Sequence, residues 1–239
     1  MNFTALIIGA NSAIAQAITE RYIQQTDCER VFTVSRHPAS FTGRKVTQLL
    51  TDYSEHSIAE ICSTLLPFAK TITRLIICNG TLHDNYFMPE KKVADINAAQ
   101  LAKTYHINTI IPMLWLSHLA PILEQGQIVK IAVFSARVGS ISDNRMGGWY
   151  SYRASKAALN MLIQCSSIEY ARRAPNVKLI AFHPGTTDTP LSKPFQRAVA
   201  KNKLFTPAFV AKKLLSILDQ SEVNQKAAYL DWNNDPITW

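Results

Sequence analysis

The sequence predicts an α/β fold in one domain: a doubly wound parallel sheet of about seven strands with helices on both faces. Two observations support this prediction. Short apolar runs alternate with longer helix-like patterns along almost the whole chain. In addition, the 239 residues contain no linker, internal repeat or low-complexity stretch, so we expect residues 1–239 to form a single domain with a sizeable core.

The predicted strands are short runs of apolar and β-branched residues bounded by turns. They cover residues 3–8, 30–35, 46–50, 75–78, 128–134, 177–182 and, as a last short strand, 227–230. Helical patterns cover residues 16–25, 57–68, 94–123, 152–172 and 207–218. Because strands and helices alternate, the sheet is expected to be parallel, with a ligand crevice at the carboxyl ends of its strands.

A turn of small residues follows the first predicted strand. It begins at Gly9 and runs directly into the first helical pattern. A strand, a tight turn and a helix in this order let a backbone approach a pyrophosphate and direct a helix N-terminus at it. Asn11 or Ser12 is expected to cap that helix. The usual dinucleotide fingerprint has three glycines, whereas here Ala13 and Ala15 fill the later places, so an ordinary tight turn is the alternative.

Tyr152 and Lys156 lie four residues apart at the head of a helical pattern, so both side chains fall on one helix face. A cation beside a phenol lowers the phenol's pKa from about 10 toward the operating pH. A tyrosine tuned in this way exchanges a proton with a carbonyl or alcohol oxygen. Because Tyr and Lys are common on helix surfaces, a non-functional exposed pair is the alternative, and the surrounding motifs decide between the two.

With these motifs the chain resembles the short-chain dehydrogenase/reductase family over essentially its whole length. The resemblance implies a Rossmann-type fold that binds a nicotinamide dinucleotide and an enzyme that transfers hydride between this cofactor and a carbonyl or alcohol carbon. The matching places, in the family's order, are the turn from Gly9 to Ala15, Asp52, Cys78-Asn79-Gly80, Asn108, the pair Tyr152 and Lys156, and Pro184-Gly185 with Thr187 and Thr189.

The resemblance also implies roles for individual residues. Tyr152 would be the proton donor, Lys156 would hold the nicotinamide ribose and keep Tyr152 acidic, and Asn108 would position a water that refills the proton. The residues implied in nucleotide binding are Gly9, Asn11, Ser12, Ile14, Ser35, Arg36, Asp52, Asn79, Gly80, Tyr152, Lys156, Pro184, Gly185, Thr187 and Thr189. No metal site is expected.

The finer pattern around residues 135–141, 147–150 and 236–239 is similar to the C-factor and sniffer-type carbonyl reductases. It also contains the main departure from the family, because Ala136 stands where the catalytic serine is usual. Ser135 faces the same way only if the strand end twists or bulges, since successive residues of a strand point to opposite sides. Ser140 in the following loop is the alternative. We favour Ser135 as the catalytic serine, and either serine can instead be structural.

The choice of cofactor depends on the residues after the second predicted strand. Ser35-Arg36-His37 stand there, without the acid that would bind both ribose hydroxyls of NAD. Arg36 offers a planar fork suited to a phosphate, and Ser35 offers a further donor. The basic residue usual in the glycine loop is missing. NADP(H) is therefore favoured over NAD(H), and a solvated surface role for Arg36 is the alternative.

We expect an NADP(H)-dependent oxidoreductase that reduces a small carbonyl compound or oxidises the alcohol. The alternative is a nucleotide-binding regulatory or signalling protein on the same fold with vestigial catalysis, which Ala136 and the eroded glycine loop favour. Residues 189–204 are expected to form the substrate lid. Because this segment mixes apolar residues with Lys193 and Arg197, the sequence leaves both apolar and anionic substrates open.

The net charge of +8 comes from basic residues spread along the chain, without the aromatic-basic interleaving that stacks nucleic-acid bases. A basic surface that attracts a phosphate-rich cofactor is the simpler interpretation. Residues 1–8 are expected to be a strand and not a signal peptide, and no apolar run reaches the roughly 18 residues of a membrane span. The four cysteines have neither metal-ligand nor paired spacing, which indicates reduced thiols in a cytoplasmic protein. A homo-oligomer, dimer or tetramer, is expected from the family.

Overall fold

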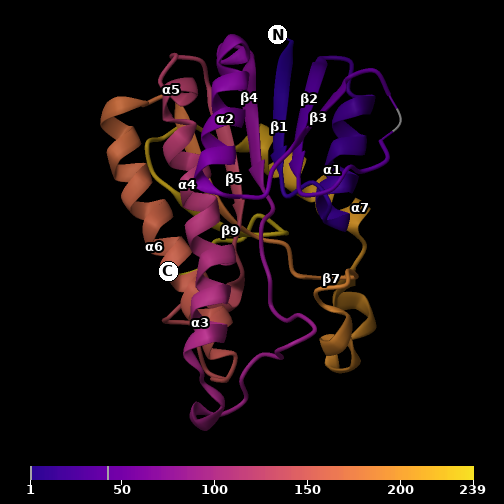
Figure 1. Cartoon of the computed structure of the whole chain (residues 1–239), viewed down its shortest axis with the longest axis vertical. Coiled ribbons are helices and arrows are strands. Elements are labelled where there is room, and N and C mark those ends of the chain that lie inside the picture. The colour runs from indigo at the N-terminus through magenta and orange to yellow at the C-terminus, as the bar shows by residue number, and fades with distance from the viewer. Residues whose placement is uncertain (1, 42) are drawn as a thin grey trace.

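The computed structural model describes residues 2–41 and 43–239, which form a seven-stranded parallel sheet between two layers of helices (Figure 1). This confirms the predicted fold class. The strands of the sheet are β1 (Phe3–Ile8), β2 (Cys28–Ser35), β3 (Val46–Leu50), β4 (Ile72–Ile77), β5 (Val129–Phe134), β6 (Val177–His183) and β9 (Ala228–Asp231). The helices are α1 (Ala13–Gln24), α2 (Glu55–Leu65), α3 (Ala98–Tyr105), α4 (Ile111–His118), α5 (Ala120–Leu123), α6 (Tyr150–Arg173) and α7 (Pro207–Gln220).

The strand order is β3-β2-β1-β4-β5-β6-β9, and each neighbouring pair is parallel. The chain therefore leaves β1 toward one edge of the sheet and returns to continue from β4 toward the other. Ligands bind at such a reversal, where the loops after two adjacent strands separate. The two loops at this point are those that follow Ile8 and Ile77.

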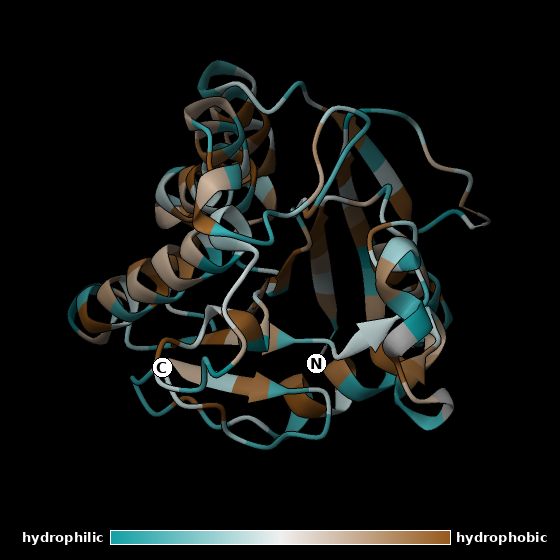
Figure 2. Cartoon of the chain, turned by 90° about the horizontal axis from the view of Figure 1, so that it is seen from below, coloured by the Kyte–Doolittle hydropathy of each residue, from teal (hydrophilic) through white to brown (hydrophobic). Residues whose placement is uncertain are grey.

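Two apolar cores lie on opposite faces of the sheet. Leu6 and Ile8 of β1 pack with residues of α2, α4 and α6, whereas Ala5 and Ile7 of the same strand pack with residues of α1 and α7. Figure 2 shows the mostly hydrophobic strands between the two helical layers. Successive residues of a strand face opposite sides, so a strand buried on both faces is apolar throughout, as the sequence of β1 is.

The first helix starts earlier than its apolar periodicity predicts. Ser12 is its N-cap, and the Ser12 hydroxyl accepts a hydrogen bond from the Ala15 backbone N–H at 3.2 Å. This identifies Ser12, one of the two expected candidates, as the cap. The N-terminus of α1 is thereby fixed directly after the turn at Gly9.

The helix predicted over residues 94–123 begins later, at Ala98, and is divided into α3, a π-helical turn, α4 and α5. Asn97 caps α3 by accepting a hydrogen bond from the Gln100 N–H at 2.9 Å, and an asparagine is better suited to such a cap than to a helix interior. A π-helical turn, His106–Ile110, then separates α3 from α4. Pro112 has no N–H to offer the carbonyl of Asn108 four residues earlier, which accounts for a break in the α-helical pattern at this place.

In the part of the chain that the structure describes, no helix is long and apolar enough to cross a membrane. The same residues contain no group of three or more histidine, cysteine, aspartate or glutamate side chains that could hold a metal ion. All four cysteines are free thiols.

Gly9 is the position where the backbone itself demands glycine. Its φ is +81°, and a Cβ there would lie 3.0 Å from the backbone nitrogen of Asn79. Gly126 has a similar φ of +90° but open space around it, so it provides a matched control. We expect Gly126→Ala to lower the free energy of unfolding by about 1–2 kcal/mol from backbone strain alone.

Gly9→Ala should cost about 1–3 kcal/mol more than Gly126→Ala, because the methyl group also collides with the backbone after β4. Urea denaturation of both variants measures the difference. Equal losses would show that the two turns are not in tight contact.

Candidate active site

Three hollows follow one another along the carboxyl ends of the strands, and we call them the outer, middle and inner hollows. Arg36 and Tyr53 belong to the outer hollow, Lys156 to the middle one and Phe195 to the inner one. Residues common to the outer and middle hollows include Asn11, Ser12, Asn79 and Gly80, and those common to the middle and inner hollows include Ile14, Ser135, Tyr152, Pro184 and Thr189. The shared walls make the hollows one continuous groove.

The turn after β1 forms the floor of this groove. Because Gly9 lacks a side chain, the turn can lie close to the backbone of Cys78 and Asn79. A Cβ at Gly9 would be only 3.0 Å from the Cys78 carbonyl carbon and from the Asn79 nitrogen. Ser12 and Ala13, at the N-terminus of α1, line the middle hollow. A helix N-terminus carries a partial positive charge and free N–H groups, which suit a phosphate group.

The turn after β2 is fixed by two side chains that were expected to bind the cofactor. The Asn11 amide donates to the His37 carbonyl at 2.9 Å, and the buried Ser35 hydroxyl donates to the same oxygen at 2.7 Å. The Ser35 hydroxyl therefore holds the turn, and its expected part in binding the cofactor remains a prediction. Arg36, between Ser35 and His37 in the sequence, is exposed and lines the outer hollow.

Tyr53 is a wall of the outer hollow that the sequence analysis missed. Its backbone is left-handed, with a φ of 65°, and its side chain is buried. Burial raises the pKa of its phenol, which also contacts the Asn79 side chain. Asp52 lines the same hollow, and hydrogen bonds from Ser54 lower the pKa of its carboxyl group. The only sequence signal for Tyr53 is its place after Asp52, because a left-handed tyrosine has no pattern of its own.

Where the outer and middle hollows meet, the turn after β4 provides an unsatisfied polar group. Asn79 Oδ1 is buried and has no hydrogen-bond partner among the described residues. Buried polar atoms are normally paired, so such an atom suggests a bound partner. Gly80 beside it leaves room in the groove, since a Cβ there would lie 3.6 Å from Lys156 Nζ. The residues present therefore fit a dinucleotide phosphate and its sugars.

Asn108 is fully buried and does not line any of the three hollows. Its side chain accepts from the Thr81 N–H at 2.7 Å and donates to the Thr81 carbonyl and the Ser155 hydroxyl, each at 2.9 Å. The amide thus fastens the chain after β4 to helix α6. Its expected part in holding a water remains a prediction.

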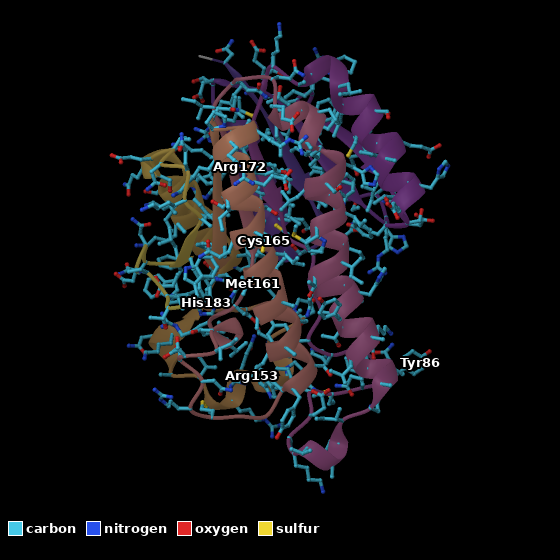
Figure 3. All side chains as sticks on the ribbon, turned by 90° about the vertical axis from the view of Figure 1, so that its left-hand side faces the viewer. Tyr86, Arg153, Met161, Cys165, Arg172 and His183 are labelled. Carbon is cyan, nitrogen blue, oxygen red and sulfur yellow. The ribbon has the colours of Figure 1, made fainter. Side chains whose placement is uncertain are left out.

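Tyr152 and Lys156 both line the middle hollow from α6, and Tyr152 also lines the inner one. The outer face of this helix carries Met161, Cys165 and Arg172, so the pair lies on the side toward the sheet (Figure 3). Lys156 Nζ donates to the Phe134 carbonyl at 2.7 Å.

The electrostatics of this pair differ from the sequence expectation. Burial lowers the pKa of Lys156 to about 7, and burial together with the nearby Tyr229 raises the pKa of Tyr152. Desolvation disfavours the charged form of each group and here outweighs the attraction expected between ammonium and phenolate. Tyr152 is therefore a protonated phenol at neutral pH.

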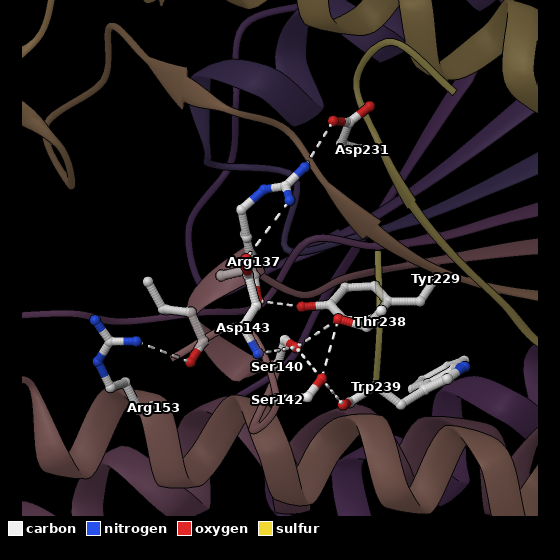
Figure 4. Close-up of polar contacts among 11 residues, drawn as sticks. Arg137, Ser140, Ser142, Asp143, Arg153, Tyr229, Asp231, Thr238 and Trp239 are labelled. Carbon is white, nitrogen blue, oxygen red and sulfur yellow. Dashed lines mark hydrogen bonds and ion pairs between the residues drawn. The ribbon is translucent and has the colours of Figure 1, made fainter. Parts of the chain in front are cut away.

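Of the two candidate serines, Ser135 lies at the site and Ser140 does not. Ser135 lines the middle and inner hollows, and its hydroxyl donates to Asn160 Oδ1 at 2.6 Å. The Ser140 hydroxyl lies instead near Thr238 at the C-terminal segment (Figure 4). Within residues 2–41 and 43–239, no hydrogen bond joins either serine to Tyr152.

Tyr229 of β9 is a second residue that the sequence analysis missed. Its hydroxyl donates to the Ala136 carbonyl at 2.5 Å, at the position where the family serine is absent (Figure 4). The Trp239 ring packs against the Tyr229 ring with centroids 5.1 Å apart, and the Ile237 N–H donates to the Tyr229 carbonyl. The C-terminal segment therefore supports the loop that contains Ser135. A long-range contact of this kind leaves no local signal in the sequence.

The inner hollow has an apolar and aromatic wall. Trp149 and Phe195 pack against each other in this wall, with ring centroids 5.0 Å apart, and Leu191 and Val199 add aliphatic surface. No lysine, arginine, aspartate or glutamate of the described chain lines it. His183 also lines the hollow, and burial lowers its pKa to about 4, so its imidazole is neutral at physiological pH.

The charged residues of the expected lid point elsewhere. Lys193 lies 3.7 Å from the Asp188 carboxylate and is largely exposed, and Arg197 is exposed as well. At the base of this segment Gly185 has a φ of +71°, and a Cβ there would lie 2.7 Å from the Phe205 ring. A small pair of strands, β7 (Thr186–Thr187) and β8 (Leu204–Phe205), closes the segment at the same place.

The structure thus brings together most of the residues expected to bind the nucleotide. Those that line the groove are Gly9, Asn11, Ser12, Ile14, Arg36, Asp52, Asn79, Gly80, Tyr152, Lys156, Pro184, Gly185, Thr187 and Thr189. Ser35 is the expected binding residue that does not. Asn108 supports the groove from below.

Comparison with known proteins agrees with this geometry. A family model described as short chain dehydrogenase matches residues 3–200. Among curated relatives, C-signal of Myxococcus xanthus is 28% identical over 147 residues, which cover 62% of this chain and 83% of the relative. Benzil reductase ((S)-benzoin forming) of Bacillus subtilis is 27% identical over 236 residues, which cover 92% of this chain and 94% of the relative.

Solved structures share the fold over the whole chain. NADPH-bound carbonyl reductase from chicken fatty liver has a TM-score of 0.84 at 22% identity, and carbonyl reductase Sniffer of D. melanogaster has 0.85 at 17% identity. Each of the two alignments covers 100% of both chains. The similarity to C-factor and sniffer-type proteins that the sequence indicates is confirmed by these matches.

Proposed function

The chain belongs to the short-chain dehydrogenase family, and we propose that it is an NADPH-dependent reductase of an uncharged, apolar carbonyl compound. The observation that carries this proposal is the continuity of the groove from Arg36 through Lys156 to Tyr152 and the inner hollow. A dinucleotide in the outer and middle hollows would end beside Tyr152, and the substrate would enter the inner hollow. In this proposal residues 1–239 are one nucleotide-binding domain, and residues 189–204 are its lid.

NADPH, when bound, supplies the hydride. The chain's own part is to position the carbonyl and to deliver a proton to its oxygen. Burial raises the pKa of Tyr152, so the phenol holds its proton at neutral pH and donates it as charge develops on that oxygen. Lys156 has donors left beyond the bond to Phe134, and these face the groove near Gly80, where a ribose would lie.

Ser135 and Asn108 take supporting parts in the same proposal. The Ser135 hydroxyl lines the middle and inner hollows and would orient the carbonyl oxygen once its proton turns from Asn160 Oδ1 to the substrate. The side chain of Asn108 is fully engaged, so a water that refills the proton would bind its backbone carbonyl. Pro112 leaves that carbonyl without the usual helical N–H donor.

An apolar substrate follows from the wall of the inner hollow. The sequence left an anionic substrate open because of Lys193 and Arg197, but neither lines the hollow, whereas Trp149 and Phe195 do. An aromatic ketone or diketone would fill this space and stack on these rings. The name of the Bacillus subtilis relative, benzil reductase, points to such a compound, so benzil is a suitable first substrate.

A nucleotide-binding regulator with weak catalysis is the second candidate. Two observations favour it: Ala136 lacks the family's hydroxyl, and the Ser135 proton is donated to Asn160 instead of facing the substrate space. This candidate predicts NADPH binding without turnover, so a screen of NADPH oxidation over aldehydes, ketones and quinones separates the two.

Tyr152→Phe should bind NADPH as the wild type does and lose about 10²–10⁴-fold in kcat, because only the acidic hydroxyl is removed. Tyr150→Phe is the matched control, since Tyr150 lies on the same helix but does not line the hollows. Steady-state reduction of benzil and fluorescence titration with NADPH give both quantities. Wild-type turnover in Tyr152→Phe would refute the assignment of the proton donor.

Arg36→Ala should reduce the preference for NADPH over NADH. Arg36 makes no hydrogen bond or ion pair with the described residues, so its guanidinium is free to bind a 2′-phosphate in a charge-assisted hydrogen bond of roughly 1.5–3 kcal/mol. This corresponds to about one to two orders of magnitude in affinity. Asp52 lines the same hollow and repels the phosphate, so we expect the lower end of that range.

Titration of wild type and Arg36→Ala with both reduced cofactors measures this preference. Arg44→Ala, which removes one positive charge outside the hollows, is the control and should retain the preference. If Arg36→Ala discriminates as well as the wild type, Arg36 is an ordinary surface residue.

A further inference from the structure

A buried carboxylate lies at the start of α6, the helix that carries Tyr152. Glu90 comes from the chain between β4 and α3 and is only 2% exposed. Its Oε2 accepts a hydrogen bond from the Ser151 N–H at 3.2 Å, and its Oε1 accepts the Ser151 hydroxyl. The Glu90 backbone carbonyl also accepts from the Trp149 N–H at 2.6 Å. Glu90 thus holds Trp149 and Ser151, one on each side of the first helical residue Tyr150, and Ser151 lies 61 positions away along the chain.

Helix α6 has no cap of its own. Trp149 occupies the N-cap position with a left-handed φ of 52° and makes no side-chain capping bond, and the first turn contains no acidic residue. Gly147 and Gly148 before it are also left-handed. The first N–H groups of a helix need partners and favour a negative charge. Glu90 supplies both from a distant segment.

Stability alone gives a poor reason for a carboxylate at this place. A buried carboxylate is costly unless it is paired, and no lysine, arginine or histidine forms an ion pair with Glu90 in the described ranges of the chain. A serine or asparagine at the N-cap would satisfy the helix more simply. What Glu90 adds is a fixed link between the helix start and the chain that follows β4.

The link reaches the site through two residues close to Ser151. Tyr152 follows Ser151 directly, and Trp149 precedes it by two positions; the ring centroids of Trp149 and Tyr152 lie 6.3 Å apart in an edge contact. The Trp149 ring also packs against Phe195 of the lid segment. A shift of the Ser151 backbone would therefore move the phenol and one wall of the inner hollow together.

We propose that Glu90 is a positioning residue that fixes the first turn of α6 and thereby sets the Tyr152 phenol against the substrate carbonyl. The inference rests on the proposed function, in which Tyr152 is the proton donor. Its two carboxylate oxygens accept the N–H and the hydroxyl of Ser151 separately, which no neutral side chain of the same length does. Glu90 does not line the hollows, so in the proposed function it would contact neither cofactor nor substrate.

Glu90→Ala should lower kcat for benzil about 10- to 100-fold, since a small displacement of a catalytic group is enough for such a loss. The dissociation constant for NADPH should stay unchanged, because Lys156 and the glycine turn remain in place. Thr206→Ala removes the cap of α7, where the Thr206 hydroxyl accepts from the Phe209 N–H at 3.2 Å. This control should lower the melting temperature while leaving kcat at the wild-type value.

Glu90→Gln keeps the size of the side chain and guards against a variant that fails to fold. Its amide has one acceptor oxygen for the two Ser151 donors, so its kcat should lie between those of wild type and Glu90→Ala. Hydrogen exchange gives a readout independent of activity: amides of residues 150–153 should exchange faster in both Glu90 variants and not in Thr206→Ala. Faster exchange in the Glu90 variants supports the role of Glu90 in fixing the first turn of α6. If the wild type reduces no carbonyl compound, that result rejects the proposed function and leaves the exchange result standing.

Unchanged kcat and unchanged exchange at residues 150–153 in Glu90→Ala and Glu90→Gln would overturn the proposal. An equal loss of kcat in Thr206→Ala and Glu90→Ala, with equally lowered melting temperatures, would also overturn it. The loss would then come from general destabilisation.

Discussion

The close backbone contact between the turn after β1 and the turn after β4 is the constraint on which the rest of the site depends. The contact is available only because Gly9 has no side chain and adopts a φ of +81°. With the two turns in contact, the N-terminus of α1, the buried Asn79 oxygen and Lys156 lie along one groove. The parallel sheet fixes where this groove runs, since its strand order reverses between β1 and β4.

Burial has opposite consequences for the two central ionisable groups. It keeps Tyr152 protonated, which a proton donor requires, and it lowers the pKa of Lys156 to about 7, which leaves that amine easily neutralised. A lysine held in this way costs stability, as is common where activity requires a strained environment. Glu90 adds a third buried ionisable group at the start of the same helix.

Local sequence patterns predicted the fold and the walls of the groove, because apolar runs and the turn residues Gly9, Asn79 and Gly80 have local causes. Other features depend on contacts between distant segments, which leave no periodic signal. Asn11 and Ser35 are taken up by the turn at His37, and Tyr229 reaches Ala136 across 93 positions. Asn97 acts as a cap where apolar periodicity predicts an unbroken helix, because its side chain competes for a backbone N–H.

Transfer of a labelled hydride tests the central claim most directly, namely that the groove binds NADPH with its reactive end at Tyr152. The protein is incubated with an aromatic ketone and NADPH in which deuterium replaces both hydrogens at the nicotinamide C4, and the product is analysed by mass spectrometry. The account predicts an alcohol one mass unit heavier, with deuterium on the carbinol carbon. An unlabelled alcohol, or a bound cofactor that is never oxidised by any carbonyl compound, would contradict it.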